Sequence, residues 1–383
     1  DVHPPLHYWL VHLWIRVAGE SEFAVRFTSV WFGVLAIALL YWVGRRLGGA
    51  PLALLAAGGL VLSRFHIEWS QQLRMYTPMV ALGITYLAVA VESWERPRRW
   101  HWPALAIMSV IGLYTLYLFG LIPLVTSAAV AIYALIPIGG RRLPLRYVAR
   151  WVVTHAVALA AFAPWVWIYL QQPRPTPKVI YPIDLWTYLH ASATAFPIGI
   201  SAHLERYTGI VAFAGVVVIV GLLRLWRRVP RLALLCSAWL LVPPLVVYAL
   251  SLPNPVLYAP NLSVRYLLVF VPAYCLLLAA GLAPRAFAAY RDGPAPAASS
   301  AHRHFWPRGT QDRGATSDRQ TTILASTPAR RSKSATFGAA LSVLAGAALV
   351  SLWLWAIWDY QTSRRLADDF QTVTDSLRAY GRP

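Results

Sequence analysis

The chain has 383 residues, of which 58% are hydrophobic, and a formal net charge of +19; its mean hydropathy is +0.52. Only 13% of the residues are charged, against the ~25% usual in soluble domains, so an ordinary soluble protein is excluded and a polytopic membrane protein is predicted. The sequence begins at Asp1 with no charged segment, apolar stretch and cleavage site before it, and we treat it as a fragment truncated at its N-terminus.

Ten apolar stretches, each bounded by polar or basic turns, are candidate membrane spans. They cover residues 22–44, 50–63, 75–93, 102–117, 118–137, 148–170, 208–226, 231–252, 265–283 and 337–358. Cys236 and Cys275 lie inside such stretches, where small core residues are expected and neither a disulfide nor a thiolate metal site. The sequence therefore predicts an all-α helical membrane bundle.

The basic residues predict the orientation of the chain. If residues 1–21 lie outside, most lysines and arginines fall in loops on the inner side, as the positive-inside rule requires. These loops are 45–46, 96–99, 141–150, 224–231 and 284–336. Topology thus accounts for much of the net charge, and nucleic acid is not a predicted partner.

The C-terminal third has a different composition. Residues 284–336 are rich in Ala, Ser, Pro, Arg and Thr, which predicts a disordered inner loop. A solvated spacer is the preferred interpretation, and binding to anionic lipid headgroups is the alternative. The tail 359–383 is predicted to lie outside and to form a short amphipathic helix, because its apolar residues Leu366, Phe370, Val373 and Leu377 are spaced 4, 3 and 4.

Four predicted outer stretches contain nearly all the polar residues that composition does not explain. Because all four fall on one side, a functional site is predicted there. They are 1–22, with Asp1, His3, His7 and His12; 63–78, with Arg64, Glu68, Gln71, Gln72, Arg74 and Tyr76; 171–206, with Asp184 and His190; and 254–266, ending in Arg265 and Tyr266.

Simpler interpretations compete with function for some of these residues. His7 and His12 lie on an aromatic helix and indicate packing at the membrane interface, while the i,i+4 spacing of Glu22 and Arg26 indicates a helix ion pair. No HExxH pattern or GxSxG elbow occurs, so zinc and serine-nucleophile chemistry are not predicted.

The functional interpretation is preferred for three charged residues. Glu68 and Arg74 stand between two spans, where a charge is costly unless it is paired or functional. Arg265 stands at the mouth of a span beside Tyr266, and the fork of donors on an arginine suits a phosphate group.

Three motifs in order resemble one family. The stretch DVHPPL, followed by GESEFAVRFTSVWFGVLAIALLYWVGRRLGG, is similar to the polyprenyl-phosphate-dependent GT-C membrane glycosyltransferases, and above all to the protein mannosyltransferases of glycosyltransferase family 39. The stretch SRFHIEWSQQLRMYTPM resembles bacterial Rgt-type sugar transferases, and VRYLLVFVPAYCLLLAAGL resembles their late span containing Arg-Tyr. The resemblance covers residues 1–283.

The resemblance implies a fold and a reaction. The fold would be a GT-C bundle of about eleven or more helices, with about ten spans in this fragment and short juxtamembrane helices on the outer face; the first span would precede Asp1. The donor would be a polyprenyl monophosphate sugar that enters from the bilayer. A carboxylate of the first outer loop would act as general base on an acceptor hydroxyl, with inversion at the sugar and lipid phosphate as the leaving group.

The resemblance also assigns residues. Asp1 and Glu68 are the candidate catalytic acids, and the candidate substrate-binding residues are His3, Arg74, Tyr76, Arg265 and Tyr266. His3 occupies the position where related aminoarabinose transferases have a phosphate-contacting lysine. The chain departs from the family at Gln71–Gln72, where relatives often have an acid, and the principal acid of the family usually lies upstream of the HPP motif.

We therefore predict a glycosyltransferase of the bacterial inner membrane with its site on the extracytoplasmic side. Residues 1–283 would form the catalytic core, 284–336 a basic cytoplasmic loop, and 337–383 the last span and outer tail. Membrane lipids, the lipid-linked donor and a glycan, lipid or protein acceptor are the expected partners; no cofactor is certain, and a divalent cation is left open. Two alternatives are a transporter or flippase of a lipid-linked saccharide and an inactive relative.

Overall fold

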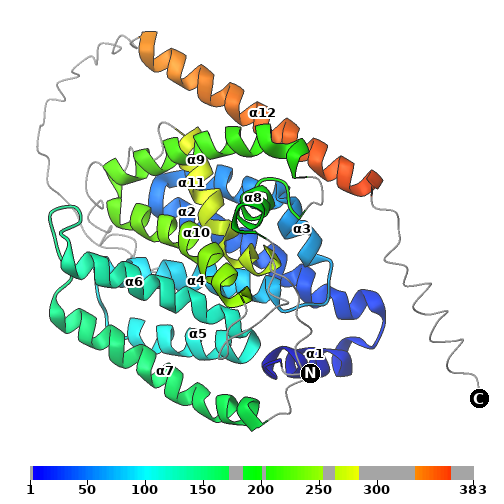
Figure 1. Ribbon diagram of the computed structural model, residues 1–383, viewed down its shortest axis with the longest axis vertical. Coiled ribbons are helices and arrows are strands. Elements are labelled where there is room, and N and C mark those ends of the chain that lie inside the picture. Colours follow the sequence, from blue (N-terminus) through cyan, green and yellow to red (C-terminus); the bar gives the residue numbers. More distant parts are fainter. Residues whose placement is uncertain (1–2, 172–183, 201–203, 253–263, 284–332, 364–383) are drawn as a thin grey trace, which may run out of the picture.

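The computed structural model describes residues 3–171, 184–200, 204–252, 264–283 and 333–363, and every named element in these ranges is a helix (Figure 1). The predicted all-α fold is confirmed. The helices are α1 (Leu6–Ala18), α2 (Glu22–Leu62), α3 (Arg64–Ser70), α4 (Tyr76–Glu95), α5 (His101–Thr115), η1 (Tyr117–Gly120), α6 (Leu121–Leu135), α7 (Leu145–Gln171), α8 (Leu185–Ala195), η2 (Glu205–Tyr207), α9 (Thr208–Arg228), α10 (Pro230–Ser251), η3 (Val264–Phe270), α11 (Val271–Leu282) and α12 (Lys333–Ser363).

Seven helical segments in the described part of the chain are long and apolar enough to cross a membrane. They are Glu22–Leu62, Tyr76–Glu95, Tyr117–Leu135, Leu145–Gln171, Glu205–Arg228, Pro230–Ser251 and Val264–Leu282. Each of the ten predicted spans falls on a helix, but α5 has only 15 residues, and the apolar part of α12, Ser342–Trp358, is also short. The remaining predicted span is the second half of α2.

The helix α2 is broken in the middle. Gly49 has φ 82° and ψ −174°, a backbone conformation that glycine adopts easily, and Pro51 follows it. A Cβ added to Gly44 would lie 2.8 Å from the Cα of Ala53, so the two halves of α2 pack directly on each other. The break lies between the predicted spans 22–44 and 50–63, at Gly49.

The centre of the bundle is α11. Every residue from Val271 to Gly281 is buried, and α11 packs against α9, α2 and α10. The contact with α9 is tight because two glycines meet there: a Cβ on Gly221 would collide with the carbonyl oxygen of Leu277. Cys236 and Cys275 are buried in the core, as predicted.

The predicted start and end of the C-terminal span both differ from the structure. The helix α12 runs from Lys333 to Ser363, whereas the sequence predicted 337–358. Residues 333–336 are thus helical and not part of a disordered loop; a helix once begun extends past its apolar stretch because each added residue gains a hydrogen bond. Residues 284–332 and the predicted tail helix around 366–377 lie outside the described residues.

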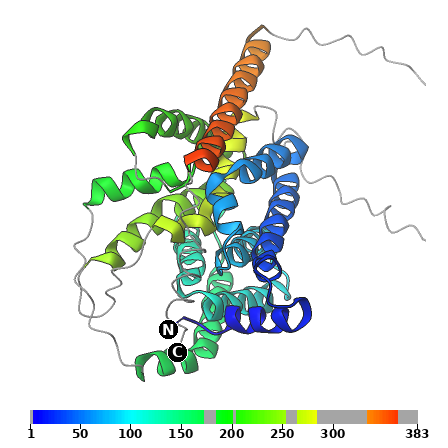
Figure 2. The same cartoon turned by 90° about the vertical axis from the view of Figure 1, so that its right-hand side faces the viewer.

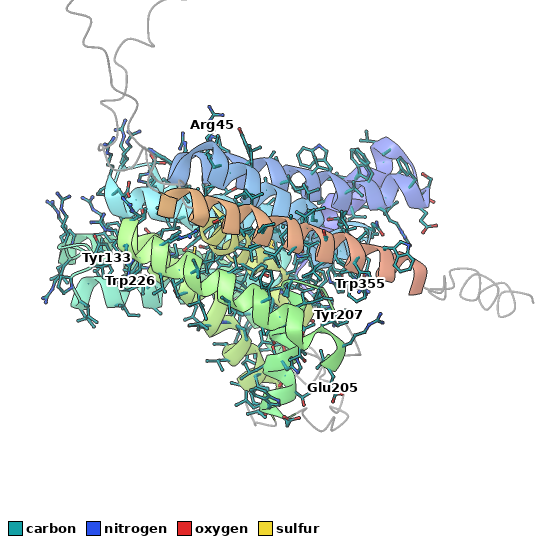
Figure 3. The ribbon with its side chains drawn as sticks, turned by 90° about the horizontal axis from the view of Figure 1, so that it is seen from above. Arg45, Tyr133, Glu205, Tyr207, Trp226 and Trp355 are labelled. Carbon is teal, nitrogen blue, oxygen red and sulfur yellow. The ribbon has the colours of Figure 1, made fainter. Side chains whose placement is uncertain are left out.

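Three short helices lie outside the seven candidate spans. They are α1, α3 and α8, and Figure 2 shows α1 lying crosswise to the first half of α2. On α1 the large apolar side chains of Trp9, Leu13 and Val17 are exposed, as expected for a helix that rests in a membrane interface. In Figure 3, Tyr133 and Trp226 mark one end of the bundle, while Tyr207 and Trp355 lie near the other.

Candidate active site

Two tyrosines and an arginine form the centre of the candidate site. The Nη2 of Arg265 donates a hydrogen bond to the hydroxyl of Tyr266 at 3.3 Å, and its guanidinium carbon lies 5.1 Å from the centre of that ring. The ring of Tyr76 meets the ring of Tyr266 edge to face, with centroids 5.8 Å apart. Tyr76 on α4 and Tyr266 on η3, almost 190 positions apart in the sequence, thus hold the guanidinium of Arg265 between them.

The turn between α3 and α4 places a second arginine beside this group. The backbone N–H of Arg74 donates to the carbonyl of Gln72 at 2.8 Å, which tightens the turn directly before α4. Two hydrogen bonds tie the turn to α2: the Ser29 hydroxyl donates to the carbonyl of Arg74 at 3.4 Å, and the Thr77 hydroxyl donates to the carbonyl of Ser29 at 2.9 Å. The side chain of Arg74 stays exposed.

The N-terminal segment brings two histidines to the same place. Pro4 and Pro5 precede α1, so the backbone enters the helix with a restricted φ and without donors that the first turn would leave unsatisfied. His3 is half-buried and His7 is buried. Burial, and after it the positive charge of Arg74, lowers the pKa of His3, and the same two causes lower the pKa of His7 to about 4. Both imidazoles are therefore neutral at pH 7.

An apolar groove begins at His7. It has a volume of about 240 Å³ and lies between α1, α2, α4 and α5, lined mainly by aliphatic side chains. Among them are Leu6 and Leu10 of α1, Leu35 and Leu39 of α2, and Met79 of α4. The groove gives the charged end of the site an apolar continuation, which is the shape that a lipid with an anionic headgroup requires.

The structure brings together five of the seven predicted site residues. His3, Arg74, Tyr76, Arg265 and Tyr266 interact electrostatically with one another at this end of the bundle. Their roles remain predictions, because the geometry establishes only that they are neighbours.

The two predicted catalytic acids, Glu68 and Asp1, are not shown to belong to this group of five residues. Glu68 is half-buried on α3, and the neighbouring ring of Trp69 packs edge-on against Tyr76 at 4.7 Å. The helix α3 ends at its C-cap Gln71, so Glu68 lies about one helical turn before the Gln71–Gln72 pair, as the sequence predicted. Asp1 lies outside the described residues.

Sequence reasoning missed His7. The sequence indicated packing at the membrane interface for both His7 and His12. This prediction fits His12, which is exposed. His7, in contrast, is buried at the head of the groove near Arg74. The i,i+4 spacing of His3 and His7 around a helix start was a signal that could have grouped them. The simpler interpretation of Glu22 and Arg26 is confirmed, since they form an ion pair of 2.6 Å.

The third predicted stretch joins the site region through its backbone. Gly199 has a positive φ of 96°, and a Cβ there would lie 3.3 Å from the Cγ of Arg64 on α3. Asp184 caps α8 by accepting from the N–H of Thr187 at 2.9 Å, so its carboxylate has a structural role. His190 lies 3.3 Å from the Thr208 hydroxyl.

Comparison with known proteins supports the resemblance predicted from the sequence. Residues 2–168 match the family model for dolichyl-phosphate-mannose-protein mannosyltransferase. Among curated proteins, none matches the chain. The resemblance to the GT-C membrane glycosyltransferases is thereby confirmed.

Solved structures of ArnT from Cupriavidus metallidurans are similar in fold. The form bound to undecaprenyl phosphate matches with a TM-score of 0.50 and 18% identity, over 74% of this chain and 51% of that one. The apo form matches with a TM-score of 0.49 and 16% identity, over 73% of this chain and 49% of that one. The chain thus spans about half the length of these proteins, and it shares the polytopic helical fold of ArnT.

Proposed function

We propose that this chain, which resembles the GT-C membrane glycosyltransferases, belongs to an enzyme that moves a sugar from a polyprenyl-phosphate donor to an acceptor hydroxyl. The observation that supports this most directly is the convergence of Arg74, Arg265 and the two tyrosines at the head of an apolar groove. A lipid monophosphate sugar has an apolar chain, one phosphate and one sugar, and the arrangement offers a place for the first two.

The arginines would bind the phosphate that links lipid and sugar. Two glutamates form ion pairs away from the site: Glu22 with Arg26 at 2.6 Å and Glu92 with Arg46 at 3.8 Å. The neutral histidines add hydrogen-bonding groups but no charge. A phosphodiester would be attracted to the two arginines, and the lipid chain would follow the groove from His7 between α2 and α4.

The reaction would then need one base and one stabilised leaving group. The acceptor oxygen attacks the anomeric carbon from the side opposite to the phosphate, while a carboxylate takes the hydroxyl proton. The bond from the anomeric carbon to the phosphate oxygen breaks, and lipid phosphate leaves with the electron pair under the positive charge of the arginines. Attack from the opposite side inverts the anomeric centre. Asp1 and Glu68 are the candidates for the base.

The comparisons support the donor class without fixing the substrate. The ArnT structure was solved with undecaprenyl phosphate, so a protein of this fold binds a polyprenyl phosphate. For this chain the acceptor is proposed to be a glycan, lipid or protein that reaches the extracytoplasmic face of the inner membrane, because the predicted orientation puts the site on that face.

The test uses the full-length protein in nanodiscs with a panel of polyprenyl-phosphate sugars and candidate acceptors, with and without EDTA. Release of polyprenyl phosphate together with an acceptor-linked sugar of inverted configuration supports the proposal. Glu68→Gln and Asp1→Asn, measured beside it, identify the base as the variant that loses turnover while still binding donor. Donor binding without turnover in the wild-type protein would refute the enzyme and favour a lipid-linked saccharide transporter.

A further inference from the structure

Two turns between candidate spans lie at the end of the bundle opposite the candidate active site. The helix α4 begins at Tyr76, in that site, and ends at Glu95, about 29 Å away at 1.5 Å per residue. Glu95 acts electrostatically on Tyr133, near the end of α6, so α6 ends at the same level. Because the hydrocarbon core of a bilayer is about 30 Å thick, these turns are placed at the membrane surface opposite the site.

The turn between α6 and α7 is tight and presents two arginines. The backbone N–H of Ile138 donates to the carbonyl of Arg141 at 2.9 Å. Gly139 and Gly140 between them have φ of 62° and 76°, as a turn with two left-handed central residues requires. The side chain of Ile138 is buried, whereas Arg141 and Arg142 are exposed. The turn thus holds two neighbouring arginines at the surface.

The turn between α9 and α10 brings three more arginines to the same place. A Cβ on Gly139 would lie 3.4 Å from the Cγ of Pro230, the first residue of α10, so the two turns are in contact. Arg227 and Arg228 end α9 and are exposed. Arg228 lies within about 8 Å of Pro230, because consecutive Cα atoms are about 3.8 Å apart. We call the arginines of the two turns the arginine cluster: Arg141, Arg142, Arg227, Arg228 and Arg231.

The positive charge of the arginine cluster exceeds the acidic charge around it. Glu95 acts on the same tyrosine, Tyr133, as two arginines of the cluster and can compensate one of them. The sequence has no Asp or Glu in residues 96–183 or 206–291, so α6, α7, α9 and α10 contain no acidic residue. Glu92, the other acid at the end of α4, pairs with Arg46. An excess of positive charge therefore remains at the two turns.

Topology and helix dipoles explain only part of the cluster. The positive-inside rule accounts for basic residues in a loop, but not for their gathering in two turns that touch. The helix dipole favours Arg227 and Arg228 at the C-terminus of α9, yet it disfavours Arg231 in the first turn of α10. Like charges gathered around one contact repel each other, and a bound anion would relieve that repulsion.

Exposed apolar side chains flank the cluster on the side of the bilayer. Leu135 at the end of α6 is 73% exposed, Leu145 at the start of α7 is 82% exposed, and Trp226 in the last turn of α9 is 49% exposed. Tyr133 and Trp226 lie at this end of the bundle in Figure 3. A ligand here meets positive charge and, beside it, side chains that face hydrocarbon, which suits a phospholipid. An acidic protein segment would use only the charge.

We propose that the arginine cluster binds an anionic phospholipid with two phosphates, of the diphosphatidylglycerol type. One phosphate would lie on Arg141 and Arg142 and the other on Arg227 and Arg228, since the fork of donors on each arginine suits a phosphate. The acyl chains would follow the exposed apolar sides of α6, α7 and α9 into the bilayer. Two touching turns, each with a pair of neighbouring arginines, match two phosphates joined by a short linker, whereas a lipid with one phosphate would engage one pair.

The experiment measures lipid dissociation constants by native mass spectrometry of the full-length protein in neutral detergent. The lipids are diphosphatidylglycerol, phosphatidylglycerol and phosphatidylcholine with identical acyl chains. We expect diphosphatidylglycerol to bind at least about fivefold more tightly than phosphatidylglycerol, and phosphatidylcholine to bind most weakly. Arg142→Gln and Arg228→Gln should each weaken diphosphatidylglycerol by about fivefold, and the double variant by about 25-fold.

Arg45→Gln is the matched control. It removes one exposed arginine of α2 that lies outside the two turns, where its Nη1 donates to the Tyr41 hydroxyl at 3.1 Å, and we expect the dissociation constant to stay within about twofold of wild type. Equal affinity for the two anionic lipids, or a loss in Arg45→Gln as large as in Arg142→Gln, would overturn the proposal. Unchanged affinity in both cluster variants would also overturn it and would favour an acidic protein segment as the occupant. Because no sugar donor enters the measurement, its outcome is independent of the proposed enzymatic function.

Discussion

Replacing Arg265 by alanine tests the assignment of the phosphate site most directly. The guanidinium is half-buried and oriented by Tyr266 at 3.3 Å and by Tyr76. A unit charge about 4 Å from the leaving phosphate contributes ~4 kcal/mol at an effective dielectric constant of about 20. Partial exposure of the guanidinium weakens this electrostatic interaction. In mutational series, hydrogen bonds to charged groups contribute ~1.5–3 kcal/mol.

A loss of about 2–3 kcal/mol corresponds to a decrease in kcat/KM of about 30- to 150-fold, since each 1.36 kcal/mol is tenfold. Most of the loss is expected in kcat, because charge accumulates on the phosphate as the sugar leaves. Arg265→Lys keeps the charge but loses the fork of donors and the stacking on Tyr266, so about a 5- to 10-fold loss is expected.

The assay is release of polyprenyl phosphate in nanodiscs, with thermal unfolding in detergent measured in parallel. The cation–π contact at Tyr266 contributes ~0.5–1 kcal/mol, so only a small decrease in Tm is expected. Arg206→Ala is the control. Arg206 belongs to η2, outside the site, and its guanidinium carbon lies 5.1 Å from the centre of the Trp355 ring. If Arg265→Ala keeps kcat/KM within about threefold of wild type, or loses no more than Arg206→Ala, Arg265 does not bind the leaving phosphate.

Three further predictions concern a proton, a hydrogen bond and a helix contact. Burial and Arg74 lower the pKa of His3, so His3 is neutral from pH 8 down to 6.5 and binding of the donor diester should not depend on His3 in that range; binding should tighten only at lower pH, where the imidazole gains a proton, and His3→Gln should remove that tightening as measured by calorimetry. His155 accepts from the Tyr86 hydroxyl at 2.7 Å, and a double-mutant cycle of His155→Leu with Tyr86→Phe should give a coupling of ~0.6–1.7 kcal/mol in detergent unfolding; zero coupling would refute the bond. Gly221→Val should lower Tm by several degrees because the new side chain meets a carbonyl of α11. Gly215→Val, with open space around it, should not. Equal effects of the two substitutions would contradict the close packing of α9 on α11.

Much of the fold could be predicted because hydropathy depends on local composition. Each of the ten apolar stretches became helical, and the Gly49–Pro51 sequence marked the break in α2 through the backbone preferences of those two residues. The start of α11 was less predictable. The sequence indicated one span from 265, yet its first turns form the 3₁₀ helix η3, and apolar spacing does not separate a 3₁₀ from an α start.

The candidate site could be predicted as a set of residues but not as a geometry. Arg74 and Arg265 were identified because charges between spans are costly, which is a property of each position. The stacking of Tyr76 on Tyr266 depends on how α4 packs against η3, and no local pattern encodes that contact. For the same reason His7 was taken for interfacial packing: its burial arises from α1 folding back over α2 and α5.

The two ends of the α2–α4 pair differ in the charged residues they carry. At one end Arg74 and Arg265 stand beside neutral histidines, so their positive charge favours an anion there. At the other end Arg46 forms an ion pair with Glu92 at 3.8 Å and lies over the ring of Trp42. Ser29 and Thr77 tie α2 to α4 by a 2.9 Å hydrogen bond at the first end, and the helices are stiff over the distance between the ends. The contacts at the two ends therefore restrict how far α2 and α4 can separate at the groove, where the donor chain is proposed to lie.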